Sequence, residues 1–454
     1  MNARSMHTDA LGTPIALTGD RMLDRAEFWR RVNGLADALS ARSERRWALV
    51  CEDSSWFAAG LFALAKAGRN IVLPQAPQAG SLQASGAEID AVLTDCPHQF
   101  PGFAVLSATE AKRSDSAMPH MPDDAALIES YTSGSSGTPK CVTKAFAQLR
   151  LEVAALEREW GTRLGDALVI GTVPHYHLYG LLVRVLWPLM AGRTFLTTTC
   201  LQPPELRRYA ATHRCIIVSS PAFLSRITDC SELPPAKRIA AVFSSGAPLP
   251  DTTAEMLQRD WGHAPVEIYG STETGGIAWR AWSGAGERAL WRPINGVQVE
   301  LREEAAGERL WVKSDFTWQS DWMATGDLAR LNQDGRFVLL GRADDVVKFE
   351  DKRVSLSEIR IRLMTHAWVS DARLLLVPGR RSVIGAVVIL SPQGRAAHDA
   401  YGKVKVRDTL RALLRESYEA ILVPRKWRFL NELPDNDMGK IELVRLQRLF
   451  EKKA

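Results

Sequence analysis

The sequence predicts an α/β protein with a large N-terminal domain, in which β-sheets are flanked by helices, and a small α+β C-terminal domain. Two observations support this fold class. Up to about residue 270, short apolar runs typical of buried strands alternate with segments whose apolar residues recur at helical spacing. After residue 326 the pattern changes to a hairpin and then to mixed short segments. Alternating strands and helices are typical of parallel sheets built from βαβ units.

The N-terminal elements follow one another at short intervals. Helices are predicted where apolar residues recur at helical spacing: 25–41, 55–67 and 178–190. Strands are predicted at short apolar runs: 47–51, 71–73, 91–94, 167–173, 215–219, 239–243 and 266–269. The last three runs end in Ser, Gly or Pro, and such residues gather at the carboxyl ends of parallel strands, where α/β proteins bind their ligands.

The C-terminal part begins with a predicted hairpin, formed by strands 328–331 and 336–340 around the turn 332–335. A polar break at Gly341–Asp345 follows. Beyond it the expected elements are a helix near 356–364, strands near 372–377 and 383–390, a helix near 404–414 and a strand near 426–429. We therefore expect an N-terminal domain of residues 1–341 and a C-terminal domain of residues 342–454.

Composition restricts the classes of function. The chain has 454 residues, of which 46% are hydrophobic and 24% charged, with a formal net charge of +5. Its positive charge is spread out, without a basic block interleaved with aromatics, so no nucleic-acid partner is expected. No apolar run is long enough to span a bilayer, and six cysteines without zinc spacing indicate reduced thiols. A cytoplasmic enzyme without membrane insertion is expected, as a monomer or homodimer.

The most informative stretch is residues 131–140, where hydroxyl side chains alternate with glycines ahead of a proline and a lysine. Glycines let backbone N–H groups approach an anion, and the hydroxyls and the lysine add further donors. The alternative is a flexible Ser/Gly linker. The spacing is not that of the Walker loop. The candidate phosphate-binding residues are Thr132, Ser133, Gly134, Ser135, Ser136, Gly137, Thr138 and Lys140.

This loop resembles the phosphate-binding signature of the acyl-adenylate-forming superfamily, which includes acyl- and aryl-CoA synthetases. The resemblance implies ATP-dependent activation of a carboxylic acid to an acyl-adenylate, followed by transfer to a thiol with release of AMP and pyrophosphate. It also implies a large domain made of several subdomains and a small, mobile C-terminal domain. ATP and Mg²⁺ are the implied cofactors.

Residues 268–273 (Ile-Tyr-Gly-Ser-Thr-Glu) resemble the second signature of the superfamily. By that resemblance Glu273 binds Mg²⁺, Thr272 contacts the α-phosphate and Tyr269 stacks on adenine, with Gly270 and Ser271 beside them. Magnesium prefers one or two carboxylates plus phosphate oxygens, which suits a single glutamate. The alternative is a strand followed by an ordinary capped helix N-terminus.

Further segments match the superfamily in its order. The adenine loop of the superfamily resembles the segment Gly246, Ala247 and Pro248. Asp327 of Thr-Gly-Asp resembles the carboxylate that binds the ribose hydroxyls. The alternative for each segment is an ordinary turn. Residues 341–345 resemble the hinge signature, which implies that Arg342 helps to hold the ribose and that Asp344 is the pivot. Lys440 resembles the lysine that bridges the substrate carboxylate and the α-phosphate, although a surface lysine in a turn is the alternative.

The acid and the acceptor are less determined. His177 matches the histidine that lines the acyl site, and the stretch around it resembles aryl-acid ligases of bacterial aryl polyene and xanthomonadin-type pathways. This suggests a hydroxylated aromatic acid such as 4-hydroxybenzoate, with polar partners among His175, Tyr179, Ser219 and Ser220. The thiol is that of CoA or of an acyl carrier protein acting in trans.

The chain departs from the superfamily at two positions, because Cys141 and Asp351 stand where glycines are usual. Asp351 puts the thioester-forming half-reaction in question without touching the adenylation residues. The alternatives are a medium-chain fatty acyl synthetase, adenylation with transfer to a non-thiol acceptor, and a relative that has lost its chemistry. The last is disfavoured because Lys140, Glu273, Asp327 and Lys440 are all present.

Overall fold

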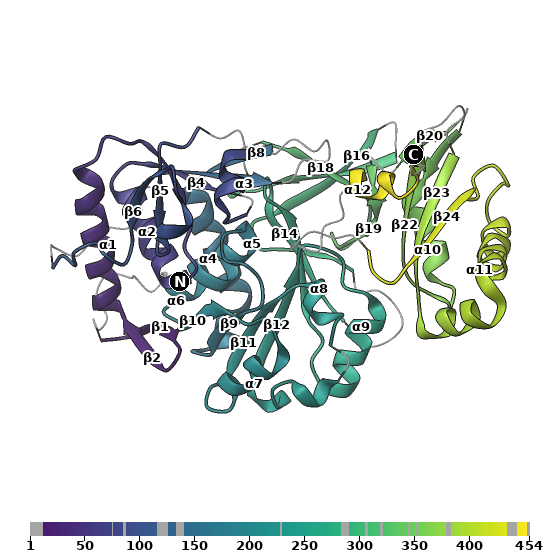
Figure 1. The fold of residues 1–454 in the computed structure, drawn as a ribbon. Helices are drawn as coiled ribbons and strands as arrows, with labels where there is room; N and C mark the ends of the chain where they lie inside the picture. Colours follow the sequence, from purple (N-terminus) through teal and green to yellow (C-terminus); the bar gives the residue numbers. More distant parts are fainter. Residues whose placement is uncertain are drawn as a thin grey trace. The chain divides into compact units, whose positions relative to one another are not determined.

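The computed structural model describes residues 12–74, 76–84, 88–115, 126–132, 140–227, 229–282, 290–304, 307–317, 321–343, 346–349, 352–377, 383–433 and 443–451. Its contacts divide the chain into two compact units (Figure 1). The first comprises Met1–Gln298 and Lys313–Trp322, and the second comprises Val299–Val312 and Met323–Ala454. The domain boundary expected after residue 341 remains a prediction, since its hinge residue Asp344 lies outside the described residues.

A six-stranded sheet is the first layer of unit 1. Its order is β6-β5-β3-β4-β7-β8, and all neighbours are parallel except β7 and β8. The strands are β3 (Arg46–Leu49), β4 (Asn70–Leu73), β5 (Ala91–Thr94), β6 (Ala104–Ser107), β7 (Leu127–Thr132) and β8 (Lys140–Ala145). The helix α1 (Arg25–Ser40) precedes β3, whereas α2 (Ser54–Lys66) and α3 (Ala79–Ala84) connect β3 to β4 and β4 to β5. The predicted alternation of strands and helices is confirmed here.

A nine-stranded sheet is the second layer, in the order β15-β14-β13-β12-β11-β9-β10-β1-β2. The strands are β1 (Pro14–Thr18), β2 (Arg21–Asp24), β9 (Leu168–Gly171), β10 (Phe195–Thr199), β11 (Cys215–Ser219), β12 (Ile239–Ser245), β13 (Val266–Ser271), β14 (Gly275–Ala281) and β15 (Arg292–Pro293). The six strands from β13 to β1 are parallel to their neighbours, whereas β14, β15 and β2 run antiparallel. Antiparallel strands therefore close both edges.

Helices accompany this second sheet. They are α4 (Phe146–Leu164), α5 (Leu178–Gly180), α6 (Trp187–Ala191), α7 (Pro203–Ala210), α8 (Pro221–Leu224) and α9 (Asp251–Met256). The single helix predicted over residues 178–190 is interrupted, because residues 181–186 form a π-helical turn between α5 and α6. Among the described helices, none combines the length and the apolar character needed to cross a bilayer.

The core of unit 1 joins both sheets. One buried cluster contains Trp47 of β3, Phe146 of α4 and Phe243 of β12. Trp160 of α4 meets Phe243 edge to face, with 5.2 Å between ring centroids, and Trp187 lies 5.6 Å from the same ring. Edge-to-face pairs of this kind add to the free energy gained from burial. The helix α4 is thereby fixed between the sheets.

Unit 2 contains three sheets. A four-stranded sheet has the order β16 (Gln298–Glu304), β17 (Gly307–Lys313), β18 (Met323–Leu331) and β19 (Phe337–Arg342). The pair β20 (Val346–Phe349) and β21 (Lys352–Ser355) follows, and β22 (Val369–Val377), β23 (Val383–Leu390) and β24 (Lys426–Leu430) form the third. Its helices are α10 (Leu356–Met364), α11 (Pro392–Arg415) and α12 (Leu443–Arg448). The predicted hairpin and α+β pattern are confirmed.

Candidate active site

Four loops of unit 1 begin at one edge of the nine-stranded sheet. They follow β9, β11, β12 and β13, which are neighbours and parallel. Parallel strands present their carboxyl ends at the same edge, so these loops converge, as ligand-binding loops do in α/β sheets. The loops contain His177, Ser220, Gly246 and Glu273. The predicted gathering of polar residues at strand ends is therefore present.

The β7–β8 hairpin brings the Ser/Gly-rich segment toward this edge. Thr132 and Lys140 are the last cross-strand partners at the loop end of the hairpin, so the chain between them connects β7 to β8. Ser133, Gly134, Ser135, Ser136, Gly137 and Thr138 lie outside the described residues, and their predicted role stays a prediction. Lys140 Nζ donates to Glu273 Oε1 at 2.6 Å. The two charged residues predicted for phosphate and metal binding thus meet.

Glu273 lies in a tight turn between β13 and β14. Burial opposes its ionisation, but the hydrogen bond and charge of Lys140 outweigh this and hold the pKa of Glu273 below its ordinary value. The carboxylate is therefore ionised at neutral pH, as a metal ligand must be. Tyr269, Gly270 and Ser271 lie inside β13, and an antiparallel strand follows the turn. The alternative of a capped helix N-terminus is therefore wrong.

Thr274 fixes the geometry of this turn, and no motif indicated it. Its buried hydroxyl exchanges hydrogen bonds with the hydroxyl of Ser271 at 3.0 Å and accepts one from the Ser271 backbone N–H at 2.9 Å. Gly275 follows with a φ of +68°, a conformation that favours glycine. The turn is therefore held by local hydrogen bonds whether or not a ligand is bound.

Two buried charged residues lie near the turn without bonding it directly, and both were missed by sequence reasoning. Glu152 of α4 accepts a hydrogen bond from the Gly276 N–H at 2.7 Å, and Lys144 of β8 donates to the carbonyl of Phe316 at 2.7 Å. Burial raises the pKa of Glu152 and lowers that of Lys144, while the charge of each opposes the shift of the other. Their sequence surroundings resemble an exposed strand and an exposed helix, so no local pattern signals them.

The predicted adenine loop follows β12 directly. Gly246 has a φ of +97°, which explains the glycine, and Leu249 N donates to Glu267 Oε2 of β13 at 2.9 Å. Ser245 Oγ donates to the Ile268 carbonyl at 2.7 Å. The loop with Ala247 and Pro248 is thus joined to β13, the strand that carries Tyr269. The ring of Tyr269 lies 5.5 Å from that of Trp291.

The histidines after β9 have separate environments. His177 precedes α5 and is partly exposed, with its ring 4.6 Å from that of Tyr176. His175 is buried, and its Nε2 contacts the carbonyl of Cys51 at 2.8 Å. Burial, assisted by the charge of Arg184, lowers the pKa of His175 to about 3. His175 is therefore a neutral core residue.

The other residues suggested to contact the substrate acid differ in whether their hydroxyl groups already form hydrogen bonds within the protein. Ser219 is buried and accepts a hydrogen bond from the Thr172 hydroxyl at 2.8 Å. Ser220 caps α8 by accepting from Phe223 N at 3.4 Å. Tyr179 is partly buried beside Ser219, and burial raises the pKa of its hydroxyl. Within the described part of the chain the Tyr179 hydroxyl forms no hydrogen bond of normal geometry, although the nearby Ser219 backbone opposes the rise of its pKa.

Arg184 is a fully buried cation next to these loops. Its guanidinium donates to the carbonyl of Val173 at 2.8 Å, to the hydroxyl of Thr199 at 2.7 Å and to the carbonyl of Thr197 at 3.1 Å. Burial lowers its pKa to about 10, so it remains charged at neutral pH. It joins the start of the loop after β9 to the end of β10.

The candidate ribose residues lie in unit 2, on the hairpin β18–β19. Asp327 and Arg342 are cross-strand partners. A Cβ at Gly326 would lie 2.5 Å from Arg342 Nη2, so this glycine leaves the space that the guanidinium occupies. Thr325 Oγ1 donates to the Leu310 carbonyl at 2.9 Å and accepts from Asp327 N at 3.1 Å. Thr-Gly-Asp is therefore part of a strand, and the alternative of a plain turn is wrong.

Three predicted positions cannot be placed. Asp344, Asp351 and Lys440 lie outside the described residues, and their roles stay predictions. Cys141, the other departure, lies on β8 with its thiol 3.9 Å from Glu129 Oε2. Its side chain faces the β7 neighbour, so the substitution is accommodated within the sheet. Among the described residues, no three His, Cys, Asp or Glu side chains are grouped to hold a metal ion.

Comparison with known proteins identifies the family. The model of the family described as AMP-binding enzyme matches residues 7–314. The 4-coumarate–CoA ligase of Rhodobacter capsulatus is 29% identical over 310 residues, 68% of this chain and 73% of that protein. The sulfoacetate–CoA ligase of Cupriavidus necator is 26% identical over 412 residues, 85% and 74% of the two chains. The 3-hydroxybenzoate–CoA ligase of an Aromatoleum species is 25% identical over 363 residues, 73% and 68%.

The fold is also found among solved structures. The ATP-bound RpMatB–BxBclM chimera B1 superposes with a TM-score of 0.84, covering 98% of this chain and 97% of that one at 21% identity. The similarity spans the whole α/β architecture, as the sequence predicted. With a family match over residues 7–314, the chain belongs to the AMP-binding enzyme family and is an AMP-forming acid–thiol ligase of the acyl-adenylate-forming superfamily.

Proposed function

We propose that the protein uses ATP and Mg²⁺ to activate a hydroxylated aromatic acid, such as 4-hydroxybenzoate, and transfers the acyl group to a thiol. The observation that carries the adenylation step is the contact between Lys140 and Glu273, 2.6 Å apart where the phosphate-loop hairpin meets β13. The site combines a cation for phosphate oxygens with a carboxylate for a metal ion, and the adenine loop begins at the neighbouring strand.

The proposed chemistry has two steps. An oxygen of the substrate carboxylate attacks the α-phosphorus of ATP, the bond to the β-phosphate breaks, and pyrophosphate leaves. The thiol then attacks the acyl carbon, loses its proton and displaces AMP. Both reactants of the first step are anions, so the site must supply positive charge and hold the attacking oxygen in line.

The residues have distinct proposed roles in the first step. Lys140 neutralises phosphate oxygens, Thr272 hydrogen-bonds the α-phosphate, and Lys440 bridges the acid and the α-phosphate. Asp327 accepts hydrogen bonds from the ribose hydroxyls, and Arg342 supports it as its cross-strand partner. Glu273 fits a magnesium site because its carboxylate is ionised and partly exposed. Bound there, Mg²⁺ would offset the charge of the leaving pyrophosphate.

The acid is proposed from two lines of support. Relatives named for aromatic acids include 4-coumarate–CoA and 3-hydroxybenzoate–CoA ligases. The tyrosine hydroxyl of Tyr179 lies next to β11 and could hydrogen-bond a ring hydroxyl, whereas His175 and Ser219 already have structural partners. A medium-chain fatty acid is the alternative substrate. We also propose the aryl polyene type of pathway and a cytoplasmic location, supported by six free cysteines.

The adenylation proposal is tested by acid-dependent release of pyrophosphate from ATP and Mg²⁺. The panel is 4-hydroxybenzoate, 3-hydroxybenzoate, 4-coumarate, benzoate, octanoate and acetate, with Lys440→Ala as the inactive control. A signal for one hydroxylated aromatic acid that Lys440→Ala greatly reduces supports both the chemistry and the acid class. Preference for octanoate contradicts the acid class alone, and turnover that survives in Lys440→Ala contradicts the mechanism.

The acceptor is proposed to be CoA or an acyl carrier protein acting in trans. Arg407, Arg411 and Arg415 recur every four residues on α11 and so share one face, which suits an acidic carrier. Transfer to a non-thiol acceptor remains the alternative that Asp351 raises. Arg407→Glu combined with Arg411→Glu should slow loading of a carrier and spare free CoA. Lys405→Glu, exposed on another face of α11, is the matched control; equal effects on both thiols would contradict docking at this face.

A further inference from the structure

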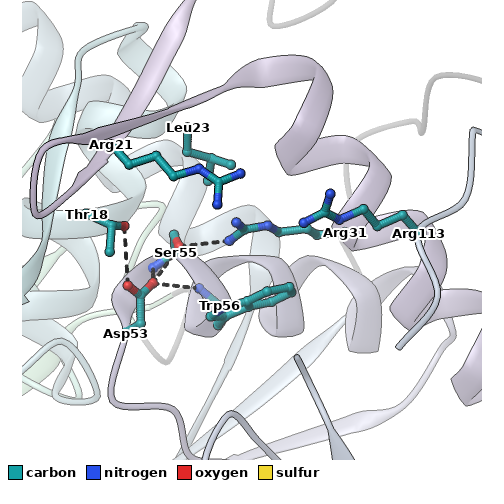
Figure 2. Close-up of a pocket in the computed structure, with 8 residues that line it drawn as sticks. All are labelled: Thr18, Arg21, Leu23, Arg31, Asp53, Ser55, Trp56 and Arg113. Carbon is teal, nitrogen blue, oxygen red and sulfur yellow. Dashed lines mark hydrogen bonds between the residues drawn. The ribbon is translucent and has the colours of Figure 1, made fainter. Parts of the chain in front are cut away.

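A polar pocket in unit 1 is lined by residues other than those assigned to the active site above. It has a volume of about 250 Å³ and lies between the β1–β2 hairpin, α1 and the start of α2. Its lining residues are Thr18, Arg21, Leu23, Arg31, Asp53, Ser55, Trp56 and Arg113. Figure 2 shows that the side chains of Arg21, Arg31 and Arg113 come from three different segments and extend toward the same space.

The positive charge at this pocket exceeds the negative charge. Glu27 is buried beside it and is shared by three arginines, with contacts of 3.0 Å to Arg30, 3.5 Å to Arg31 and 2.9 Å to Arg113. Arg21 is exposed and forms no ion pair with any acidic residue in the described part of the chain. The carboxylates of Glu27 and Asp53 thus lie among the guanidinium groups of the three lining arginines, which leaves an excess of one positive charge.

Asp53, the acidic residue within the lining, forms hydrogen bonds with the N-terminus of α2. Its carboxylate accepts from the backbone N–H groups of Ser55 at 2.8 Å and Trp56 at 3.2 Å, and from the hydroxyl of Ser55. It is therefore the N-cap of α2. All three bonds fall on Oδ1, and the carboxylate keeps its negative charge, which favours the charged form of Arg31.

Arg31 is the most buried of the three cations. Its side chain is only 10% exposed, its guanidinium stacks over the Trp56 ring at 4.0 Å, and its Nη1 donates to Ser55 Oγ at 3.2 Å. Burial lowers its pKa, the nearby charge of Arg113 lowers it further, and Glu27 and Asp53 oppose the shift. Two like charges held close together gain free energy when an anion lies between them.

We propose that this pocket binds a small phosphate-bearing anion, such as inorganic phosphate, pyrophosphate or a small organic phosphate. The planar guanidinium fork matches phosphate oxygens, and Arg31 is preorganised by Trp56 and Ser55. The volume is below the range of about 300–1,000 Å³ typical of sites for drug-sized ligands, so the ligand is small. The site does not depend on the adenylation proposal, because it shares no residue with that machinery.

The test is calorimetric titration of the full-length protein with inorganic phosphate and with pyrophosphate at constant ionic strength. We expect saturable binding that Arg21→Gln and Arg113→Gln each weaken by about tenfold, as expected for the loss of a hydrogen bond to a charged group. Both side chains are exposed enough that the variants should fold, which thermal unfolding checks. Arg30→Gln is the matched control, since Arg30 also contacts Glu27 but does not line the pocket.

A reciprocal variant separates this site from the ATP site. Lys140→Ala should lose adenylation and keep the phosphate binding that the pocket variants lose, whereas the pocket variants should keep adenylation. Binding that disappears in Lys140→Ala and persists in Arg21→Gln and Arg113→Gln would overturn the proposal. So would equal weakening by Arg30→Gln, which would indicate a general effect of positive charge.

Discussion

Removal of the Lys140 ammonium should damage catalysis far more than stability. Lys140 Nζ lies 2.6 Å from Glu273 Oε1, but its side chain is 52% exposed and that of Glu273 is 25% exposed. Exposed ion pairs contribute about 0.2–1 kcal/mol to folding. Loss of a preorganised donor at developing charge costs about 2.7–4 kcal/mol in the transition state. Lys140→Ala should therefore lower kcat/KM by about 10²–10³ while the free energy of unfolding changes by about 1 kcal/mol or less.

The assay measures acid-dependent pyrophosphate release alongside urea unfolding for each variant. Lys313→Ala is the matched control, because Lys313 is also a half-exposed lysine of unit 1 and lies 3.7 Å from Asp321. Glu273→Gln, alone and combined with Lys140→Ala, completes a double-mutant cycle. Because the two residues are proposed to act on the same phosphates, their effects on kcat/KM should be strongly non-additive. A kcat/KM that falls less than about threefold in Lys140→Ala, or no more than in Lys313→Ala, would refute the reasoning.

Three further predictions concern buried residues. In the folded protein His175 stays neutral down to about pH 3, whereas in the unfolded chain it takes up a proton below about pH 6.5. The free energy of unfolding should therefore decrease by about 1.4 kcal/mol for each unit by which the pH is lowered from about 6.5 to about 3. His175→Gln, measured by urea unfolding at several pH values, should reduce this dependence. Gly275→Ala places a Cβ 2.5 Å from Glu152 Oε2 at a φ of +68° and should cost about 1–3 kcal/mol in urea unfolding and lower pyrophosphate release; unchanged stability would contradict the turn geometry. Arg184→Met removes the donor that hydrogen-bonds the Val173 carbonyl, so it should lower the free energy of unfolding by about 1–3 kcal/mol or more, as measured by thermal unfolding. A variant more stable than the wild type would show that the buried charge destabilises the fold.

Local pattern predicted much of the fold. The runs at 215–219 and 266–269 are strands β11 and β13 almost residue for residue, because apolar runs bounded by Ser, Gly or Pro signal buried parallel strands. The return strand β14 was not predicted, since it pairs through the turn at Thr274 and its identity depends on that pairing. The π-helical turn at residues 181–186 was also missed, because its apolar pattern equals that of an α-helix.

Motifs that combine glycine with a charged residue indicated Lys140, Glu273 and Asp327, and the roles of these residues stay predictions. No motif indicated the charged residues that are buried beside the candidate site. Lys144 shares a strand face with the buried Val142 and Glu152 lies on a long helix, but lysine and glutamate are so rarely buried that their residue types predicted exposure. Their partners, Phe316 and Gly276, are more than a hundred residues away in sequence.

The contact between Lys140 and Glu273 also bears on the order in which the substrates arrive. A free divalent cation must compete for this carboxylate with an ammonium that the protein itself tethers there. With Lys140 and Glu273 in their proposed roles, a metal ion carried by the nucleotide would meet less opposition, because the phosphates would give Lys140 a new anion as Glu273 is released. The protein should therefore accept the metal–nucleotide complex in preference to the bare ion, and Lys140→Ala should bind Mg²⁺ alone more tightly than the wild type.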